Sequence, residues 1–362
     1  MRAFVYDRAS NEAAAIHAAS MLTQLPEVQG RPPVEYLAGG TTLVDLMKLD
    51  VMRPAKVVDL GALARVHNAI TVSPDGVRLG AMVKMSAAAD HPEIIKNYPV
   101  VAQSLQLAAS AQLRNMATPD GNVLQRTRCP YFRDTSWTAC NKRDPGSGCA
   151  AIGGLNRQHP ILGGSPDCIA TYPGDFAQSL IALGATVNVA GSAGVRTIPF
   201  GSLHRAPGAT PNVETVLAPG DLITGFNLPA GPWTRRSLYL KIRDRQSYEF
   251  ALASAAVALD MDGSKVREAR IALGGLATIP WRSREAEDAL VGKTLTEPVA
   301  EAAARAAFAD ARPRVHNAFK VALGQFDLGP RAAASRRTGG LNDDRSSCSR
   351  ACRQYGPTHS AL

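Results

Sequence analysis

Hydrophobic residues recur along the first ninety positions in short runs that end at glycine, proline or aspartate. One run, at 34–37, leads directly into the turn Ala38-Gly39-Gly40-Thr41-Thr42, and leucines at helical spacing follow it. This pattern predicts a strand, a glycine turn and a helix in succession. Three more strands are predicted from similar runs at 57–60, 69–72 and 77–80.

The rest of the chain alternates helical and strand patterns around one irregular segment. Residues 100–113 predict an alanine-rich helix, whereas cysteine, glycine, proline and arginine crowd together in residues 123–170 without a hydrophobic period. Such a segment needs something other than an apolar core to order it. Further on, strands are predicted at 237–242, 250–260 and 268–273, and alanine-rich helices between 283 and 323.

These patterns predict an α+β fold with two domains. The first domain spans residues 1–210 and contains the irregular segment 123–170 as an insertion, and the second spans residues 211–326. Residues 327–362 are rich in arginine, serine and glycine, so we expect a tail that is disordered or reading-frame-shifted, in which the spacing of Cys348 and Cys352 is incidental.

Composition narrows the class of protein. The chain has 362 residues, 45% of them hydrophobic, which suits two or three globular domains. No stretch approaches the roughly 18 apolar residues of a membrane span, and residues 1–7 lack the apolar run of a secretory signal. The formal net charge is +9, but basic runs interleaved with aromatic residues are missing, so we expect no nucleic-acid partner.

Four cysteines fall within forty residues of the irregular segment: Cys129, Cys140, Cys149 and Cys168. Two disulfides are possible, although a chain of this size without a signal sequence does not need them. Zinc sites normally contain a closely spaced cysteine pair, which is missing here. Thiolates in a glycine-rich loop also suit an iron–sulfur cluster. From spacing alone the cluster, zinc and free or disulfide-bonded cysteines remain about equally plausible.

Two glycine-bearing turns could bind phosphate groups. The turn at 38–42 offers backbone N–H groups and hydroxyls to an anionic pyrophosphate, and the turn at 114–122 offers amides and hydroxyls. Each signal alone is more often only a turn. No dinucleotide-binding glycine motif, phosphate-binding loop or serine-nucleophile motif is present. Lys241 and Arg243 alternate along one strand, which by itself favours a solvated basic face.

Taken together and in order, six segments resemble the FAD-binding subunit of the xanthine dehydrogenase and aldehyde oxidoreductase family of molybdenum hydroxylases. The segments are residues 36–49, 112–122, 169–175, 220–229, 239–248 and 271–282. The resemblance covers residue 1 to about residue 326. It implies a vanillyl-alcohol-oxidase, or PCMH-type, FAD-binding domain of two α/β subdomains, followed by a C-terminal α+β domain similar to that of the CO dehydrogenase flavoprotein.

Residues 124–149 resemble the insertion found in the flavoprotein subunit of periplasmic aldehyde oxidoreductases, which binds a [4Fe–4S] cluster. The resemblance implies that Cys129, Cys140, Cys149 and Cys168 are the four cluster ligands. Without it, the cysteine spacing leaves the alternatives above open.

The resemblance also implies which residues contact FAD. They are Leu37, Ala38, Gly39, Gly40, Thr41, Thr42 and Leu43 around the pyrophosphate, Asn115, Thr118, Gly121, Asn122 and Asp175 in a second flavin segment, and Ile223 and Lys241 near the isoalloxazine ring. One departure from the family is Pro119-Asp120, because a carboxylate beside phosphates is unfavourable unless it faces away.

In this family the chain carries no catalytic residue for the substrate. It is expected to accept electrons from a small [2Fe–2S] subunit and pass them through FAD to an external acceptor, while a large molybdenum-cofactor subunit oxidises an aldehyde to a carboxylic acid. Export to the periplasm together with the small subunit is implied, with the cytoplasm as the alternative. The competing interpretations are a self-sufficient FAD oxidoreductase and a non-enzymatic iron–sulfur scaffold.

Overall fold

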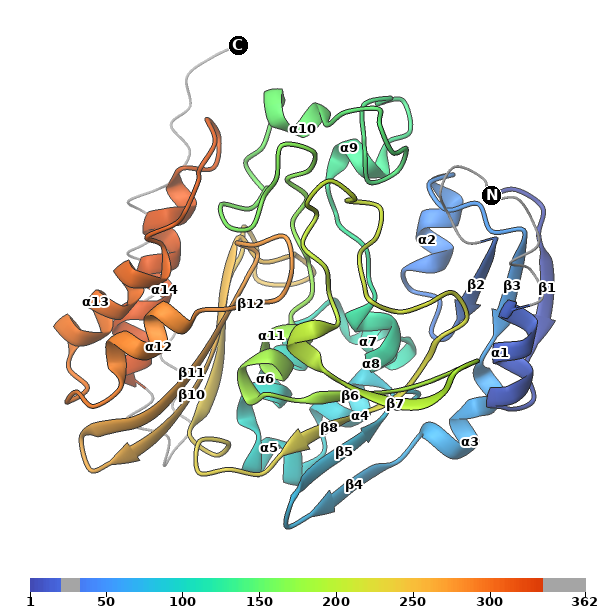
Figure 1. The fold of residues 1–362 in the computed structure, drawn as a ribbon. Helices are drawn as coiled ribbons and strands as arrows, with labels where there is room; N and C mark the ends of the chain where they lie inside the picture. Colours follow the sequence, from blue (N-terminus) through green and yellow to red (C-terminus); the bar gives the residue numbers. More distant parts are fainter. Residues whose placement is uncertain (21–32, 335–362) are drawn as a thin grey trace.

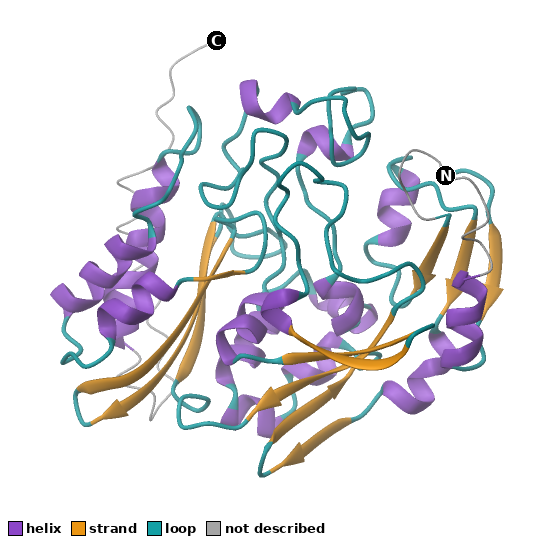
Figure 2. Cartoon of the chain, viewed as in Figure 1, coloured by secondary structure: helices purple, strands orange, loops and turns teal. Residues whose placement is uncertain are grey.

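The computed structural model describes residues 1–20 and 33–334, with side chains up to Phe326. Three sheets and the helices packed on them make up a mixed architecture (Figures 1 and 2), which confirms the predicted α+β fold. No helix among the described residues combines the length and the apolar character needed to cross a membrane.

The first sheet is parallel, with the strand order β1-β3-β2. Its elements are β1 (Val5–Arg8), β2 (Val34–Leu37) and β3 (Lys56–Asp59), with α1 (Glu12–Ser20), α2 (Leu43–Lys48), the 3-10 helix η1 (Gly61–Leu63) and α3 (Ala64–His67). Successive residues of β3 point to opposite faces, so Val58 packs with Ala15 of α1 and Val57 packs with Met47 of α2. The sheet is therefore covered by a helix on each face, as parallel strands require.

The second sheet has five antiparallel strands in the order β4-β5-β8-β6-β7. They are β4 (Ile70–Ser73), β5 (Gly76–Gly80), β6 (Thr186–Gly191), β7 (Gly194–Pro199) and β8 (Leu222–Pro229). Strand β8 is central because it pairs with β5 on one side and β6 on the other. The predicted boundary between residues 210 and 211 thus separates β8 from the sheet to which its hydrogen bonds attach it.

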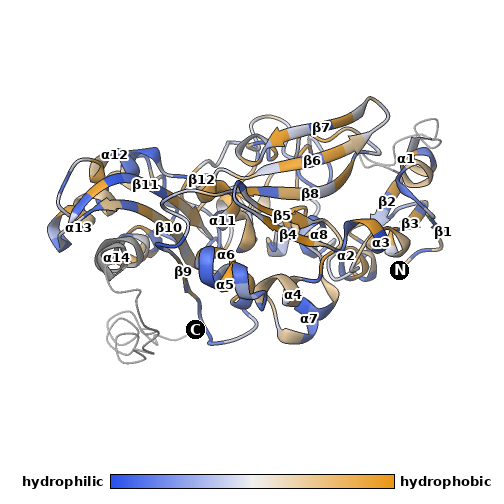
Figure 3. Ribbon diagram, turned by 90° about the horizontal axis from the view of Figure 1, so that it is seen from below, coloured by the Kyte–Doolittle hydropathy of each residue, from blue (hydrophilic) through white to orange (hydrophobic). Residues whose placement is uncertain are grey.

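Short helices contribute to the core of this sheet: α4 (Met85–Ala89), α5 (Pro92–Asn97), α6 (Pro99–Gln106), α8 (Pro119–Val123), α11 (Phe176–Leu183) and the 3-10 helix η2 (Phe200–Ser202). A further short helix, α7 (Ala111–Met116), contacts α4. Figure 3 shows hydrophobic residues along β5 and hydrophilic residues on α5. The prediction of one helix over 100–113 was wrong. The chain turns at Ala109, whose φ is 49°, and Ser110 then starts α7 by accepting a hydrogen bond from the Leu113 N–H.

The third sheet is antiparallel, in the order β12-β11-β10-β9, with β9 (Ser237–Ile242), β10 (Ala253–Asp262), β11 (Lys265–Gly274) and β12 (Trp281–Arg282). Strand β10 is buried on both faces. Ala256 and Ala258 join the core that contains α6 and α11, whereas Ala255 and Val257 face α12 (Arg284–Leu290) and α13 (Glu297–Ala307). Alanine suits this strand because small side chains let two helical layers approach one sheet.

The last helix, α14 (Phe319–Ala334), packs on the same side of this sheet as α12 and α13 (Figure 1). It continues through residues 327–334, so the first part of the predicted disordered tail is helical. The remainder of that tail, with Cys348 and Cys352, lies outside the described residues.

The cysteine segment, residues 123–170, contains only the short helices α9 (Pro130–Arg133) and α10 (Ala150–Gly153) beyond the end of α8. A buried guanidinium orders much of it. Arg143 donates hydrogen bonds to the carbonyl oxygens of Tyr131 at 2.8 Å, Phe132 at 2.9 Å and Asp134 at 3.3 Å, and also to that of Trp137. Polar contacts therefore satisfy the backbone of this segment where a larger apolar core would otherwise be needed.

Candidate cofactor-binding site

A cleft of about 590 Å³ opens between the first sheet, α8 and the loop that precedes β8. Its volume lies within the range of roughly 300–1,000 Å³ typical of cofactor pockets. The structure brings nine of the predicted FAD residues to its wall: Ala38, Gly39, Gly40, Thr41, Thr42, Leu43, Thr118, Gly121 and Ile223. Leu37, Asn115, Asn122, Asp175 and Lys241 do not line it. For the residues that line the cleft and for those that do not, contact with FAD stays a prediction.

The first glycine turn is pressed against the second. A β-carbon on Gly39 would stand 2.2 Å from the carbonyl oxygen of Met116 and 2.9 Å from the α-carbon of Ala117, so only glycine fits. Gly40 has a φ of 73°, in the left-handed region that favours glycine. The two turns therefore meet by backbone contact and form one continuous stretch of the cleft wall.

Asp120 does not face away from the cleft but forms part of its lining. Its carboxyl is buried, and burial raises its pKa from an ordinary value of 3.8 to about 6. Hydrogen bonds oppose this rise, among them one from the backbone N–H of Gly121 at 2.7 Å. The departure noted in the sequence thus places an ionisable carboxyl beside the turn that would hold phosphates.

Asp175 and Lys241 bind each other instead of lining the cleft. The Lys241 ammonium lies 2.8 Å from the Asp175 carboxylate, and both side chains are at most 5% exposed. The Tyr239 hydroxyl donates to the same carboxylate at 2.6 Å, and Lys241 donates to the carbonyl of Leu107 at 3.0 Å. This pair joins the start of α11 to β9 and hence the second sheet's helices to the third sheet.

Charged residues absent from the sequence-based set also line the cleft: Glu35, Arg126, Lys142 and Glu214. The Glu214 carboxylate lies 2.6 Å from the Arg126 guanidinium and 2.7 Å from the Lys142 ammonium. Burial acts to raise the pKa of Glu214, but the two cations outweigh it and lower the pKa to about 2. Burial raises the pKa of Glu35 to about 7. No local motif marks these residues, since their partners are far away in the sequence.

The four cysteines lie in one region of the fold, with no disulfide between them. Cys140 and Cys149 face each other in an isolated β-bridge, and the Cys129 sulfur lies 3.2 Å from Nε2 of His159. Burial raises the pKa of Cys129 to about 12 and that of Cys168 to about 11, and each thiol acts electrostatically on others of the group. Among the described residues, no three His, Cys, Asp or Glu side chains form a group that could hold a metal ion.

Backbone N–H groups contact the cysteines at a sulfur and at carbonyl oxygens. Ala170 N–H lies 3.4 Å from the Cys168 sulfur, whereas the N–H groups of Phe132 and Arg143 donate to the carbonyl oxygens of Cys129 and Cys140 at 3.1 and 2.9 Å. Such N–H···S contacts are typical of cysteines that ligate iron–sulfur clusters. Four free thiols in one region are the donor type that an iron–sulfur cluster takes, and cluster binding itself stays a prediction. His159 was missed because its neighbour Cys129 is 30 residues away.

Comparison with known proteins gives two domain families. The FAD binding domain in molybdopterin dehydrogenase matches residues 9–231, and the CO dehydrogenase flavoprotein C-terminal domain matches residues 238–325. The chain is 41% identical to the aldehyde oxidoreductase FAD-binding subunit PaoB of Escherichia coli (strain K12), over 93% of this chain and 99% of the relative.

More distant relatives have the same extent. The carbon monoxide dehydrogenase medium chain of Afipia carboxidovorans is 28% identical over 86% of this chain and 87% of the relative. A crystal structure of quinoline 2-oxidoreductase from Pseudomonas putida 86 shares the fold, with a TM-score of 0.68 and 22% identity over 92% of this chain and 98% of that chain.

We expect Lys241→Met to destabilise the fold by about 3–5 kcal/mol, because it leaves the Asp175 carboxylate buried without its cation. The double variant Lys241→Met/Asp175→Asn should recover part of that loss. Urea unfolding followed by circular dichroism measures both. Equal stabilities of Lys241→Met and the wild type would show that the pair does not hold α11 to β9.

Asp120 should make stability depend on pH. Its folded pKa of about 6 exceeds its ordinary 3.8, so the folded state holds the proton more tightly. Its contribution is fully present below pH 3.8 and lost as the pH rises through 6. Asp120→Asn should remove this fall in unfolding free energy and tighten FAD binding at pH 7. An unchanged pH profile between pH 4 and 7 would contradict the assignment.

Proposed function

This chain belongs to the family of FAD-binding subunits of molybdenum hydroxylases, and from that premise we propose that it is the electron-transfer flavoprotein subunit of an aldehyde-oxidising member. The proposal for the substrate class rests on the 41% identity to an aldehyde oxidoreductase subunit across nearly the full length of both chains. More distant relatives are named for other substrates, carbon monoxide and nicotine among them. An aldehyde substrate is therefore a more specific proposal than membership of the family.

The observation that carries the proposal is the backbone contact of the two glycine turns at Gly39, which builds one cleft wall from two separate segments. The turn at 38–42 would hold the pyrophosphate of FAD through its backbone N–H groups. Thr118 and Gly121 would contact the neighbouring part of the cofactor, and Ile223 offers an apolar surface for the ring. When bound, FAD supplies the capacity to take up two electrons and release them to an acceptor.

We also propose a [4Fe–4S] cluster on Cys129, Cys140, Cys149 and Cys168. Support comes from the four free thiols in one region, from the Ala170 N–H at the Cys168 sulfur, and from the Arg143 contacts that fix the backbone between Cys129 and Cys140. Because burial raises the pKa of Cys129 and Cys168, these thiols must lose their protons when metal binds. The chain's own residues therefore orient the ligands and shield them from water.

The proposed partners are a large molybdenum-cofactor subunit and a small [2Fe–2S] subunit. Relatives named as medium chains of dehydrogenases support a complex with larger and smaller members. In this complex the substrate is oxidised on the large subunit, and this chain relays electrons to an external acceptor.

The function is tested on the complex purified after co-expression of the three subunits. We expect one FAD and about four iron atoms per copy of this chain beyond those of the small subunit, and bleaching of the flavin absorbance when an aldehyde is added. Cys140→Ser should lower the iron content and leave FAD bound. Zinc in place of iron would contradict the cluster, and bleaching of this chain alone by an aldehyde would favour a self-sufficient oxidoreductase.

The proposed compartment is the periplasm, reached by export of the folded complex on a signal carried by the small subunit. Thiolate ligands must stay reduced until metal binds, which favours cofactor loading in the cytoplasm first. Fractionation of cells with and without the small subunit tests this order. Periplasmic protein without the small subunit would refute joint export, and purely cytoplasmic protein in its presence would assign the complex to the cytoplasm.

A further inference from the structure

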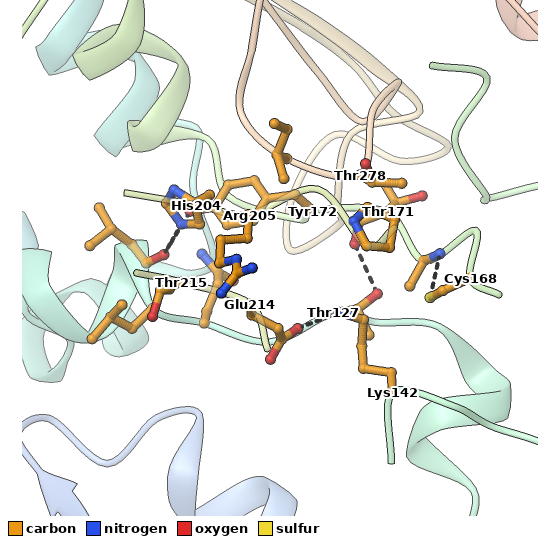
Figure 4. Close-up of a pocket in the computed structure, with 16 residues that line it drawn as sticks. Thr127, Lys142, Cys168, Thr171, Tyr172, His204, Arg205, Glu214, Thr215 and Thr278 are labelled. Carbon is orange, nitrogen blue, oxygen red and sulfur yellow. Dashed lines mark hydrogen bonds and ion pairs between the residues drawn. The ribbon is translucent and has the colours of Figure 1, made fainter. Parts of the chain in front are cut away.

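A second, smaller cavity of about 40 Å³ adjoins the flavin cleft. Cys168 and Thr127 line the small cavity, and four residues line both cavities: Leu124, Lys142, Glu214 and Thr215. Figure 4 shows Glu214 and Lys142 in this pocket together with Cys168. Lys142 and Glu214, the partners of one ion pair, thus line both the cavity that contains Cys168 and the larger cleft.

Together with Arg126, which lines the larger cleft, this ion pair forms a group of two cations and one anion, called here the ion triad: Arg126, Glu214 and Lys142. The side chains are only 15%, 28% and 11% exposed, respectively, so salt and water screen their charges less than those of surface residues. Glu214 stays ionised at neutral pH because both cations bind it. The triad therefore carries a net charge of one positive unit, fixed between the two cavities.

The positions of these groups are determined by further contacts. Lys142 follows Cys140 by two residues and donates a second hydrogen bond to the carbonyl of Pro211 at 2.9 Å. The Arg126 guanidinium lies over the ring of Phe132, 4.6 Å from its centroid. Lys142 and Arg126 are therefore each held by a contact outside the triad as well as by Glu214. Lys142 and Cys168 line the same small cavity.

We infer that the net positive charge of the ion triad sets the reduction potentials of both redox groups, the FAD and the cluster. Lys142 is the cation of the triad that lies beside both cavities. The inference rests on the proposed function, since it requires FAD in the cleft and a cluster on the cysteines. Reduction adds negative charge to each group, and a fixed cation nearby stabilises that state. A wall shared by both cavities acts on both groups in the same direction.

The test is a redox titration of the purified complex, with the flavin followed by visible absorbance and the cluster by electron paramagnetic resonance. Lys142→Met makes the triad neutral and should lower both midpoint potentials. Glu214→Gln raises the net charge and should raise both. Lys142→Arg keeps the charge and should leave them near the wild-type values. Lys96→Met, on α5 and exposed, removes a lysine charge away from both cavities and serves as the control.

Lys142→Met and Glu214→Gln are expected to shift the midpoint potentials in opposite directions. An effect of charge can therefore be distinguished from structural damage. If both variants lower the potentials, or if the shift in Lys142→Met does not exceed that in Lys96→Met, the inference is overturned. A shift confined to one redox group also overturns it. Wild-type complex that lacks FAD or the additional iron would instead refute the proposed function, and cofactor content measured on every sample distinguishes the two failures.

Discussion

The cleft of the candidate cofactor site depends on one close approach, between the backbone of Gly39 and that of Met116 and Ala117. Any side chain at Gly39 would separate the turns, and with them the parallel sheet and the helices of the antiparallel sheet on which they lie. Gly40 completes the constraint because its left-handed backbone redirects the chain into α2. Two units with separate cores thereby share one wall, and the arrangement of all later contacts around the cleft follows from it.

The cysteine segment shows how a stretch without hydrophobic period becomes ordered. Its irregular backbone leaves carbonyl oxygens that no helix or sheet satisfies, and a single buried guanidinium, Arg143, binds four of them. The Asn141 side chain adds an acceptor for Gly148 N–H at 2.7 Å and a donor to the Asp167 carbonyl at 3.0 Å. Hydrogen bonding therefore fixes the loops that carry the thiols without a large apolar core around them.

Local sequence patterns correctly predicted the helices and strands that depend only on residues nearby in the sequence. The strand, turn and helix at 34–48 and the strands of the third sheet follow from periodicity and turn residues, whereas the split between α6 and α7 depends on one residue, Ala109, with a positive φ. Membership of β8 in the second sheet arises from pairing with β5, nearly 150 residues earlier. The ion triad likewise joins residues that only the fold brings together, because Arg126 and Glu214 are 88 positions apart.

Three acidic residues from different parts of the fold form ion pairs with the cysteine segment. The exposed fractions of their side chains indicate which ion pair contributes most to stability. Asp45 of α2 pairs with Arg128 and Arg133 on either side of Cys129, and Asp244 pairs with Arg157, but these carboxylates are 39% and 43% exposed. Ion pairs at such exposure contribute about 0–1 kcal/mol. Glu214 is less exposed and binds two cations, one of which directly follows the Cys140 turn. Of the three carboxylates, Glu214 therefore makes the strongest ion-pair contact with the cysteine segment.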